Sequence, residues 1–505
     1  MNTKALRQKI LDLAIRGKLV PQDPNDEPAE VLLERIREQK QQMLKEGKLK
    51  KKDIKNDTII FKGEDNLHYE KFQDGTVKCI EDEIPFEVPE GWSWARLRDI
   101  CMMSAGKSKS TVQIKSEPFE GSYPCFGGNG VRGYVDEYNQ DGIFSIIGRQ
   151  GALCGNINIA IGKFYATEHA VVTTLFDGID FKWSNYILEA LQLNNYATGA
   201  AQPGLSVANI LNVFVPVPPT QEQDRIGNNV YESLKIVEAL EQEKIDLQKN
   251  IITAKTKILD LAICGKLVPQ DPNDEPASVL LERIRAEKEE LIKQGKIKRD
   301  KKESVIFKGE DSSYYLRTDR VEESLEDWRF DDLPETWKIC CLGELCDYGD
   351  CINVNTEDIA EDAWILDLED IEKDTGTVLK KVTKDQRNSV STKHKFHSGQ
   401  VLYSKLRPYL NKVVLSDADG YCTSEILPLE FKNCVLPEYA RYYLMSGTFI
   451  TYANHCSYGV KMPRLGTTDG KKAIFSLPPL SEQKRIVETI DFCFMQLNKI
   501  SEALA

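Results

Sequence analysis

The sequence predicts an α+β protein in which two mixed α/β modules are separated by a pair of long antiparallel helices. Three observations lead to this prediction: a nearly verbatim repeat, a second repeated helix opening, and a circular relation between the two. The first repeat is KILDLAIRGKLVPQDPNDEPAEVLLERIR at residues 9–37, which recurs at residues 257–285 with an offset of 248. A repeat of this length indicates a duplicated structural unit with pseudo-two-fold symmetry.

The second repeated segment opens a helix in each half of the chain. Residues 218–226, PPTQEQDRI, match residues 478–486, PPLSEQKRI, at an offset of 260. In both copies apolar residues follow in steps of four, four, three and three, which is typical of a coiled-coil-like stripe. We expect helix packing or partner binding from Ile226, Val230, Leu234, Val237 and Leu240, and from Ile486, Ile490, Phe494, Leu497 and Ile500.

Together, the two offsets make the repeat circular. The two ends of the chain correspond to Ile245 and Lys249, so the terminal helices tile the central helix. That central helix is expected over residues 221–264, roughly 65 Å long at 1.5 Å per residue. Its split counterpart should lie antiparallel beside it, with the stripes packed on each other. The variable regions 92–217 and 337–477 should then lie at opposite ends of the helices.

The composition is that of a globular protein with more than one domain. The chain has 505 residues, of which 41% are hydrophobic and 29% are charged. It contains no apolar run of about 18 residues, and its first residues do not resemble a signal peptide, which favours a cytoplasmic protein without a membrane span. The net charge of −13 argues against general affinity for nucleic acid. Residues 380–412 are an exception, because nine Lys or Arg stand there against one acid, giving a local charge of +8.

The cysteine pattern does not favour a metal site. Thirteen cysteines are scattered along the chain, and the closest group is Cys340, Cys341, Cys346 and Cys351. A zinc site in this group is one interpretation. We favour free buried thiols in a reducing compartment, because the group contains no C-x-x-C pair.

The order of the repeats resembles the specificity subunit of type I restriction-modification enzymes. Two further segments, residues 148–156 and 399–412, strengthen the resemblance inside the variable regions. The resemblance implies two target-recognition domains, each of which reads one half of a split sequence in double-stranded DNA. It also implies that the helices bind two methyltransferase subunits and that restriction subunits join the complex. S-adenosylmethionine, ATP and Mg would then be bound by those partners, and this chain would hold no cofactor.

On this basis the chain divides into seven regions. We expect a conserved helical region over residues 1–50, a lead-in segment over 51–91, target-recognition domain 1 over 92–220, a central helical region over 221–298, a second lead-in segment over 299–336, target-recognition domain 2 over 337–480, and a C-terminal helix over 481–505.

Candidate DNA contacts come from polar and basic residues near the turns of the variable regions. The segments 148–156 and 399–412 align at an offset of 256, and each predicts a strand, a turn with a cation, and a return strand. Cations and amides at such turns suit phosphates and base edges. The candidates in the first domain are Lys107, Ser108, Lys109, Asn129, Arg149, Gln150 and Gln202. Those in the second are Arg387, Lys393, Tyr403, Ser404, Lys405, Arg407, Tyr409 and Lys412.

The alternative interpretation of these turns is a surface hairpin with solvated charges, and His169 is expected to be a core residue. The sequence has no Walker A loop, no strand-linked G-x-G-x-x-G and no [DN]-P-P-[YF] motif, so we expect a subunit without catalytic or metal-binding residues. Two other functions remain open: a stand-alone restriction or methylation enzyme, and a structural coiled-coil adaptor.

Overall fold

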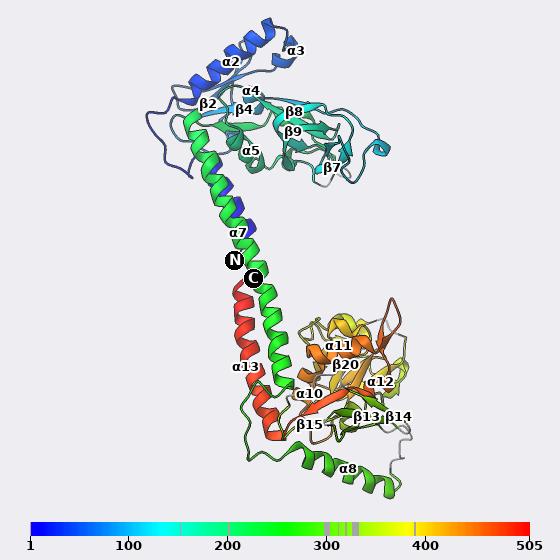
Figure 1. Ribbon diagram of the computed structural model, residues 1–505. Helices are drawn as coiled ribbons and strands as arrows, with labels where there is room; N and C mark the ends of the chain where they lie inside the picture. Colours follow the sequence, from blue (N-terminus) through cyan, green and yellow to red (C-terminus); the bar gives the residue numbers. More distant parts are fainter. Residues whose placement is uncertain are drawn as a thin grey trace. The chain divides into compact units, whose positions relative to one another are not determined.

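The structure, a computed structural model, describes residues 2–151, 153–199, 203–296, 304–311, 313–318, 321–325, 333–387 and 390–504. The chain forms two compact units, Met1–Lys244 and Ile245–Ala505. The boundary lies inside the long helix α7 (Thr220–Ile263), drawn in green in Figure 1. The bounds of α7 agree with the predicted central helix to within one residue.

The first unit places helices against a six-stranded sheet of order β5-β10-β8-β9-β6-β7. In this sheet β6 and β9 pair parallel, and the other neighbours pair antiparallel. Its helices are α1 (Thr3–Ile15), α2 (Ala29–Lys45), α3 (Lys51–Ile54), α4 (Leu97–Ile100), α5 (Phe181–Ala190), α6 (Val207–Leu211) and the first part of α7. Its strands are β1 (Ile59–Lys62), β2 (His68–Lys71), β3 (Val77–Cys79), β4 (Ser93–Arg96), β5 (Cys101–Ala105), β6 (Tyr123–Gly127), β7 (Gly130–Val135), β8 (Gln140–Gly148), β9 (Ile157–Ala166), β10 (Ala170–Leu175) and β11 (Phe214–Val217).

The second unit has the same helical frame but different sheets, of orders β16-β19-β22-β17-β18 and β21-β20-β23. Its helices are the second part of α7, α8 (Ala277–Lys293), α9 (Leu342–Leu345), α10 (Pro437–Leu444), α11 (Gly447–His455), α12 (Thr467–Lys472) and α13 (Leu480–Leu504). Its strands are β12 (Ser304–Lys308), β13 (Tyr314–Thr318), β14 (Val321–Ser324), β15 (Lys338–Cys341), β16 (Ile352–Val354), β17 (Trp364–Leu366), β18 (Val382–Thr383), β19 (Lys393–Phe396), β20 (Val401–Ser404), β21 (Val413–Leu415), β22 (Gly420–Thr423), β23 (Ile426–Leu429), β24 (Ser457–Tyr458), β25 (Arg464–Leu465) and β26 (Ile474–Leu477).

Within each unit a terminal segment of the chain lies antiparallel to part of α7 (Figure 1). In the first unit, Arg7 lies 3.7 Å from Glu238, while Gln22 donates to Glu222 at 3.2 Å. Residue numbers therefore rise along one segment as they fall along the other. The second unit repeats both contacts at the positions given by the two offsets: Lys255 donates to Asn498 at 2.6 Å and Gln270 to Glu482 at 2.5 Å. The circular repeat is thus present at the level of side-chain contacts.

The prediction that the two apolar stripes pack on each other is wrong. Ile226, Val230, Leu234 and Val237 belong to a core cluster with α1, α2 and α5, whereas Ile486 and Ile490 belong to a separate cluster with the last turns of α7. The reason is the antiparallel register, which brings each stripe opposite a KILDLAI segment, residues 9–15 or 257–263, rather than opposite the other stripe. The far ends of the stripes are less covered: Leu240, Phe494 and Leu497 are half-buried, and Ile500 is exposed.

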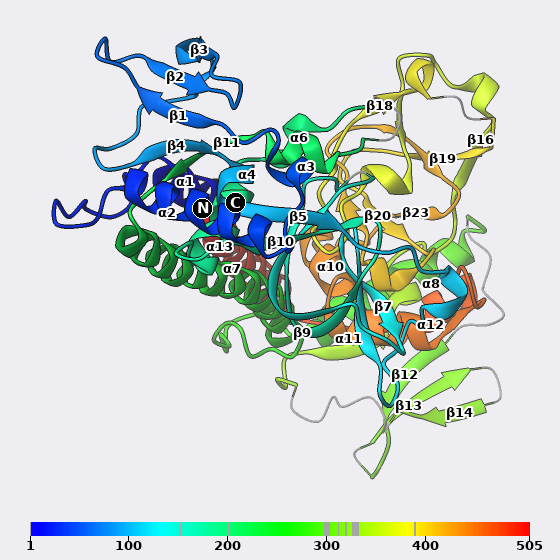
Figure 2. The same cartoon turned by 90° about the horizontal axis from the view of Figure 1, so that it is seen from above.

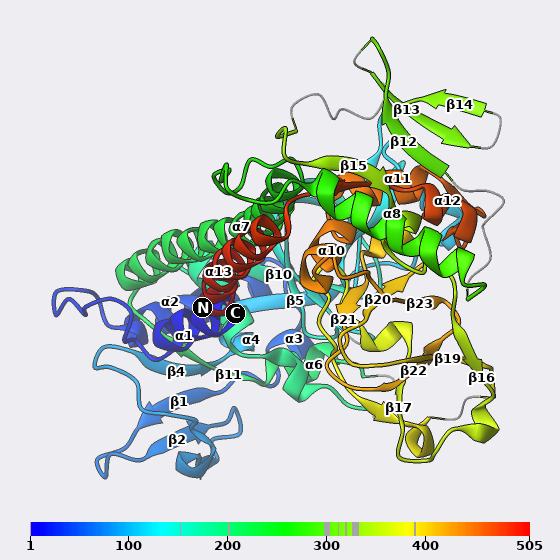
Figure 3. The same cartoon turned by 90° about the horizontal axis from the view of Figure 1, so that it is seen from below.

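Each unit also carries a three-stranded lead-in sheet, packed on the strand that begins its variable region. The sheet β1–β3 lies next to β4 in Figure 2, and β12–β14 lies next to β15 in Figure 3. The first is attached by a buried ion pair, because Arg96 lies 2.7 Å from the carboxylate of Glu70. At the corresponding positions the second unit has Cys341 and Leu316, which share an apolar cluster. The two copies therefore use opposite chemistry for the same junction.

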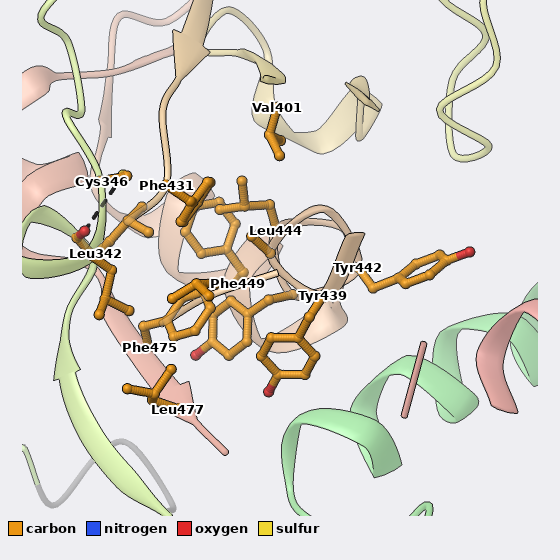
Figure 4. Close-up of a cluster of buried hydrophobic side chains, with 14 of the residues drawn as sticks. Leu342, Cys346, Val401, Phe431, Tyr439, Tyr442, Leu444, Phe449, Phe475 and Leu477 are labelled. Atoms are coloured by element: carbon orange, nitrogen blue, oxygen red, sulfur yellow. Dashed lines mark hydrogen bonds between the residues drawn. The ribbon is translucent and has the colours of Figure 1, made fainter. Parts of the chain in front are cut away.

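The core of the second unit is rich in aromatic residues, as Figure 4 shows. Tyr443 stacks on Phe475 with ring centroids 4.1 Å apart, and Tyr439 meets Phe475 edge-on. Cys340 and Cys346 are buried in this core, where their thiols point at the carbonyl oxygens of Phe475 and Leu342. Burial raises the pKa of Cys341 to about 12, so this thiol stays protonated at neutral pH.

Candidate nucleic-acid interface

The two variable regions share a backbone frame made of three segments. The first is the turn after β8 or β20, the second is the turn after β9 or β22, and the third is a hairpin that precedes α6 or α12. Four backbone hydrogen bonds recur at equivalent positions in both units, one closing the first segment and three joining the segments. In the first unit they are Gly148 N to Asn156 O (2.9 Å), Arg149 N to His169 O (3.1 Å), Leu205 N to Arg149 O (2.8 Å) and Gly151 N to Pro203 O (3.2 Å). In the second they are Ser404 N to Lys412 O (3.1 Å), Lys405 N to Glu425 O (3.0 Å), Leu465 N to Lys405 O (3.0 Å) and Arg407 N to Pro463 O (2.7 Å).

This frame agrees with the predicted strand–turn–strand at an offset of 256. Strand β8 pairs antiparallel with β9, and β20 pairs antiparallel with β21, so both turns reverse the chain as expected. Two of the predicted cations, Arg149 and Lys405, stand at the same place in the frame. The frame holds its backbone alike in both units while the side chains differ, which is the arrangement expected of two sites with different ligands.

The third segment of the frame was not recognised as a repeat from the sequence. Residues 198–205, TGAAQPGL, align with residues 458–465, YGVKMPRL, at the same offset of 260 that relates the long helices. Gly199 and Gly459 both have φ of +96°, a backbone conformation that favours glycine. The shared Gly, Pro and Leu are the signal that could have revealed the pair. Gln202, the predicted candidate in this segment, lies outside the described residues.

In the first unit, several predicted residues converge on the frame. Lys107, Ser108, Asn129 and Gln150 are exposed, and Arg149 is half-buried. The turns that carry them approach closely at Gly128, where a Cβ would lie 3.2 Å from Gln150 O and 3.6 Å from His169 O. Lys109 does not join them, because its ammonium is held by Glu137 at 2.6 Å and only 7% of its side chain is exposed. Hydrogen bonding to Glu137 raises the pKa of Lys109.

Three further polar residues of the first unit were missed or misjudged. Asn158, Glu168 and His169 border the same turns, and His169, expected in the core, has a third of its side chain exposed. Ser108 donates to Glu168 at 3.4 Å, which joins these residues to the predicted set. Within the described residues, buried polar atoms without a hydrogen-bond partner gather here: Arg149 Nε, Asn158 Nδ2, Thr167 Oγ1, Glu168 Oε2 and His169 Nδ1. Unpaired buried polar groups are costly, so such a gathering points to a polar ligand that meets them.

In the second unit, three of the residues predicted to contact DNA are buried, so the prediction of direct contact is wrong for them. Tyr403 is 3% exposed and packs edge-on against Phe449. Ser404 is also 3% exposed and donates to Leu406 O at 2.9 Å. Lys393 is 2% exposed, with its ammonium 3.1 Å from Ser391. Tyr403 and Ser404 are buried because β20 lies between β21 and β23 and all four of its residues are buried, whereas Lys393 lies on β19, between β16 and β22.

Two other cations predicted to contact DNA make hydrogen bonds inside the unit instead. Arg387 donates to Asp370 at 2.6 Å and is 11% exposed. Lys412 donates to Leu368 O at 2.6 Å, and burial lowers its pKa. The net charge around residues 380–412 in the folded unit is therefore less positive than the count along the sequence, because carboxylates from other segments lie close to these cations. Five of its nine cations lie within 4.0 Å of carboxylates: Lys380, Lys381, Lys384, Arg387 and Lys393.

The predicted residues left at the surface of the second unit are Lys405, Arg407 and Tyr409. Lys405 and Arg407 are half-buried, while half of the Tyr409 side chain is exposed. Arg407 has φ of +50°, which places it at a sharp bend before Pro408. Its guanidinium reaches Lys461 O at 3.5 Å and so borders the hairpin between β24 and β25. Cations and an aromatic ring on one bend form a surface suited to a phosphate backbone and to bases.

Among the described residues, no group of His, Cys, Asp or Glu has the geometry of a metal site, and no helix is long and apolar enough to span a membrane.

The comparisons with known proteins agree with one another in the family that they indicate. The model of the type I restriction modification DNA specificity domain matches residues 89–257 and 334–503, which is more than half of the chain. The specificity subunit of the type I restriction enzyme EcoAI of Escherichia coli is 28% identical over 577 residues, covering 98% of this chain and 90% of its own length. That of EcoprrI, also from Escherichia coli, is 46% identical over 153 residues, covering 29% of this chain and 36% of its own.

One solved structure found in the comparisons is the HsdS subunit from Thermoanaerobacter tengcongensis. It is 14% identical in sequence, with a TM-score of 0.46, and the match covers 83% of this chain and 93% of that chain.

Proposed function

The chain belongs to the family of type I restriction-modification DNA specificity subunits, and from this premise we propose that each of its variable regions reads one half of a bipartite site in double-stranded DNA. The observation that supports this most directly is the shared three-segment frame, which repeats the same four backbone hydrogen bonds under different side chains. A scaffold kept constant beneath divergent side chains suits two readers with different base preferences.

We assign the contacts with DNA to the predicted residues that reach the surface. In target-recognition domain 1 (residues 92–220) these are Lys107, Ser108, Asn129, Arg149 and Gln150, joined by Glu168 and His169. In target-recognition domain 2 (residues 337–480) they are Lys405, Arg407 and Tyr409. Lysine and arginine supply phosphate and guanine contacts, whereas Asn and Gln suit adenine.

The helices are the proposed dock for two methyltransferase subunits, through which restriction subunits join. Support comes from large apolar side chains left at the helix surfaces, among them Ile236 and Ile252 on α7 and Phe492 on α13, each about 60% exposed. Large apolar side chains that are exposed on the isolated chain are typical of a surface that a partner subunit covers in the assembly. Methylation and cleavage, with S-adenosylmethionine, ATP and Mg, would belong to those partners, and we place the assembly in the cytoplasm.

The proposal is tested by expressing the chain with its methyltransferase subunits and mapping methylated adenines across a genome. The expected result is one sequence made of two specific halves around an unread gap. Methylation with a single uninterrupted motif, or with none, would contradict it. Calorimetric titration of the chain alone with S-adenosylmethionine separates this function from that of a stand-alone enzyme, because the chain alone should not bind this cofactor.

A further inference from the structure

The hairpin between β24 and β25 of the second unit exposes unusually apolar side chains. Val460 is fully exposed, Tyr458 is 62% exposed and Met462 is 49% exposed. The hairpin follows directly after α11 in the chain. Apolar side chains held together in solvent are costly to a protein unless they meet a partner.

Several hydrogen bonds hold the backbone of the hairpin in place. Arg464 donates to Met462 O at 3.2 Å, while its other nitrogens bind Glu425 at 2.6 and 3.0 Å. Arg407 N donates to Pro463 O at 2.7 Å, which fixes the return strand. Ordering a loop on binding costs affinity, so a hairpin that is already ordered can place its side chains on a ligand at little further cost.

Positive charge surrounds the apolar tip. Lys461 is exposed at the tip itself, and Lys405 and Arg407 border the hairpin through the backbone bonds of the shared frame. A two-stranded ribbon with cations at its sides matches the major groove of DNA, which admits such a ribbon between two phosphate backbones. In that groove the apolar feature that a base presents is the methyl group of thymine.

We propose that Val460 and Met462 read the methyl group of thymine in the half-site recognised by the second module. The inference rests on the proposed function and adds to it the chemical group and the residues that read it. The matching hairpin of the first module has Ala200, Ala201 and Gln202 at the equivalent sequence positions. The first module therefore has only alanine methyl groups and an amide where the second has Val460 and Met462, so its apolar contact at this place should be smaller.

The test uses the assembled complex of the full chain with its methyltransferase subunits, and duplexes carrying the site found by methylation mapping. Each thymine of the second half-site is replaced in turn by deoxyuridine, which removes only the methyl group. One replacement should weaken binding about fourfold, the affinity equivalent of one buried methyl group. In a complex carrying Val460→Ala and Met462→Ala, the same replacement should change the affinity by less than a factor of about 1.5.

Controls separate the possible failures. The reciprocal changes Ala200→Val and Gln202→Met should leave the response of the second half-site as in the wild type. A second half-site without thymine, or deoxyuridine substitutions that are all silent, would overturn the inference while leaving the proposed function intact. A hairpin that instead wedges between bases would give that silent pattern. Loss of bipartite methylation by the wild type would refute the proposed function itself.

Discussion

Trp92 donates its indole N–H to the buried carboxylate of Glu222 over 2.9 Å, and Trp337 makes the same bond to Glu482 over 2.9 Å. These bonds explain the repeated helix openings PP-x-x-EQ-x-R-I. The Glu of the motif binds a Trp, the Gln binds the backbone, and the Arg binds an Asp of the repeated PQDPND loop, as in the pairs Arg225–Asp26 and Arg485–Asp274. The motif therefore attaches the start of each long helix to its module through hydrogen bonds and an ion pair.

The hydrogen bond between Trp92 and Glu222 leads to a first prediction, about stability. Trp92→Phe should lower the free energy of unfolding of the first unit by about 1–3 kcal/mol, because it leaves a buried carboxylate oxygen without its donor. Hydrogen–deuterium exchange should rise in residues 1–244 alone. Trp94→Phe is the matched control, because within the described residues its indole nitrogen has no hydrogen-bond partner. Equal losses in the two variants would mean that packing, and not the hydrogen bond, carries the effect.

The stability of the first unit should also depend on pH through Asp99. Burial, opposed in part by the charge of Lys40, raises the pKa of Asp99 from 3.8 to about 6. The folded unit then keeps a proton that the unfolded chain has lost, so this group lowers stability as the pH rises from about 4 to about 6. Asp99→Asn should stabilise the unit by up to ~3 kcal/mol at pH 7 and by little at pH 4.

The matching residue of the second unit, Glu344, provides the control for this pH experiment. Its carboxylate lies 2.8 Å from the guanidinium of Arg285, with side chains 12% and 48% exposed respectively, so Glu344→Gln should remove a partly solvated ion pair worth about 1 kcal/mol. Denaturant titrations at pH 4 and pH 7 measure both variants. An Asp99→Asn variant that is less stable than the wild type at pH 7 would show that the carboxylate is stabilising.

The corrected position of the apolar stripe gives a third prediction. Leu234 is 4% exposed in the core of the first unit, whereas Ile236 on the same helix is 61% exposed. Leu234→Asp should lower the free energy of unfolding of the unit by about 3–5 kcal/mol, because it buries an unpaired charge. Ile236→Asp should leave the folded state nearly unchanged but weaken binding to the methyltransferase in a pull-down. Comparable thermal shifts for the two variants would contradict the assignment of helix faces.

The fourth prediction separates cations at the surface from cations that hold the fold. Lys405→Gln should lower the slope of log affinity against log salt by about 0.9, the value for one lost phosphate contact. Arg387→Gln should leave that slope unchanged and reduce thermal stability, because Arg387 is bound to Asp367 and Asp370. Fluorescence titrations at several salt concentrations provide the slopes. An unchanged slope for Lys405→Gln would place this residue away from the DNA backbone.

The repeat made the helical part of the fold predictable from sequence. Twenty-nine residues that recur almost unchanged must form the same structure twice, and the circular relation follows from two offsets alone. The central helix was therefore placed to within one residue. What the offsets could not predict was the pairing of helix faces, because the antiparallel register depends on contacts such as Gln22 with Glu222.

The site was less predictable, for physical reasons that particular residues illustrate. All four residues of β20 are buried, so no alternation of apolar and polar residues revealed that Tyr403 and Ser404 point into the protein. The charge of the basic stretch was counted along the sequence, whereas its neutralising partners, such as Asp367 and Asp370, precede it. The hairpin at residues 458–465 was missed because its copy shares only Gly, Pro and Leu with it.

The central claim is that the two modules read DNA independently, and a module exchange tests it most directly. Residues 92–217 are replaced by the first variable region of another specificity subunit, and methylated adenines are mapped with the partner methyltransferase present. The account predicts that one half of the recognised sequence changes, while the other half and the gap between them stay fixed. If the exchange altered both halves together, the modules would not be independent readers, and the account would be wrong.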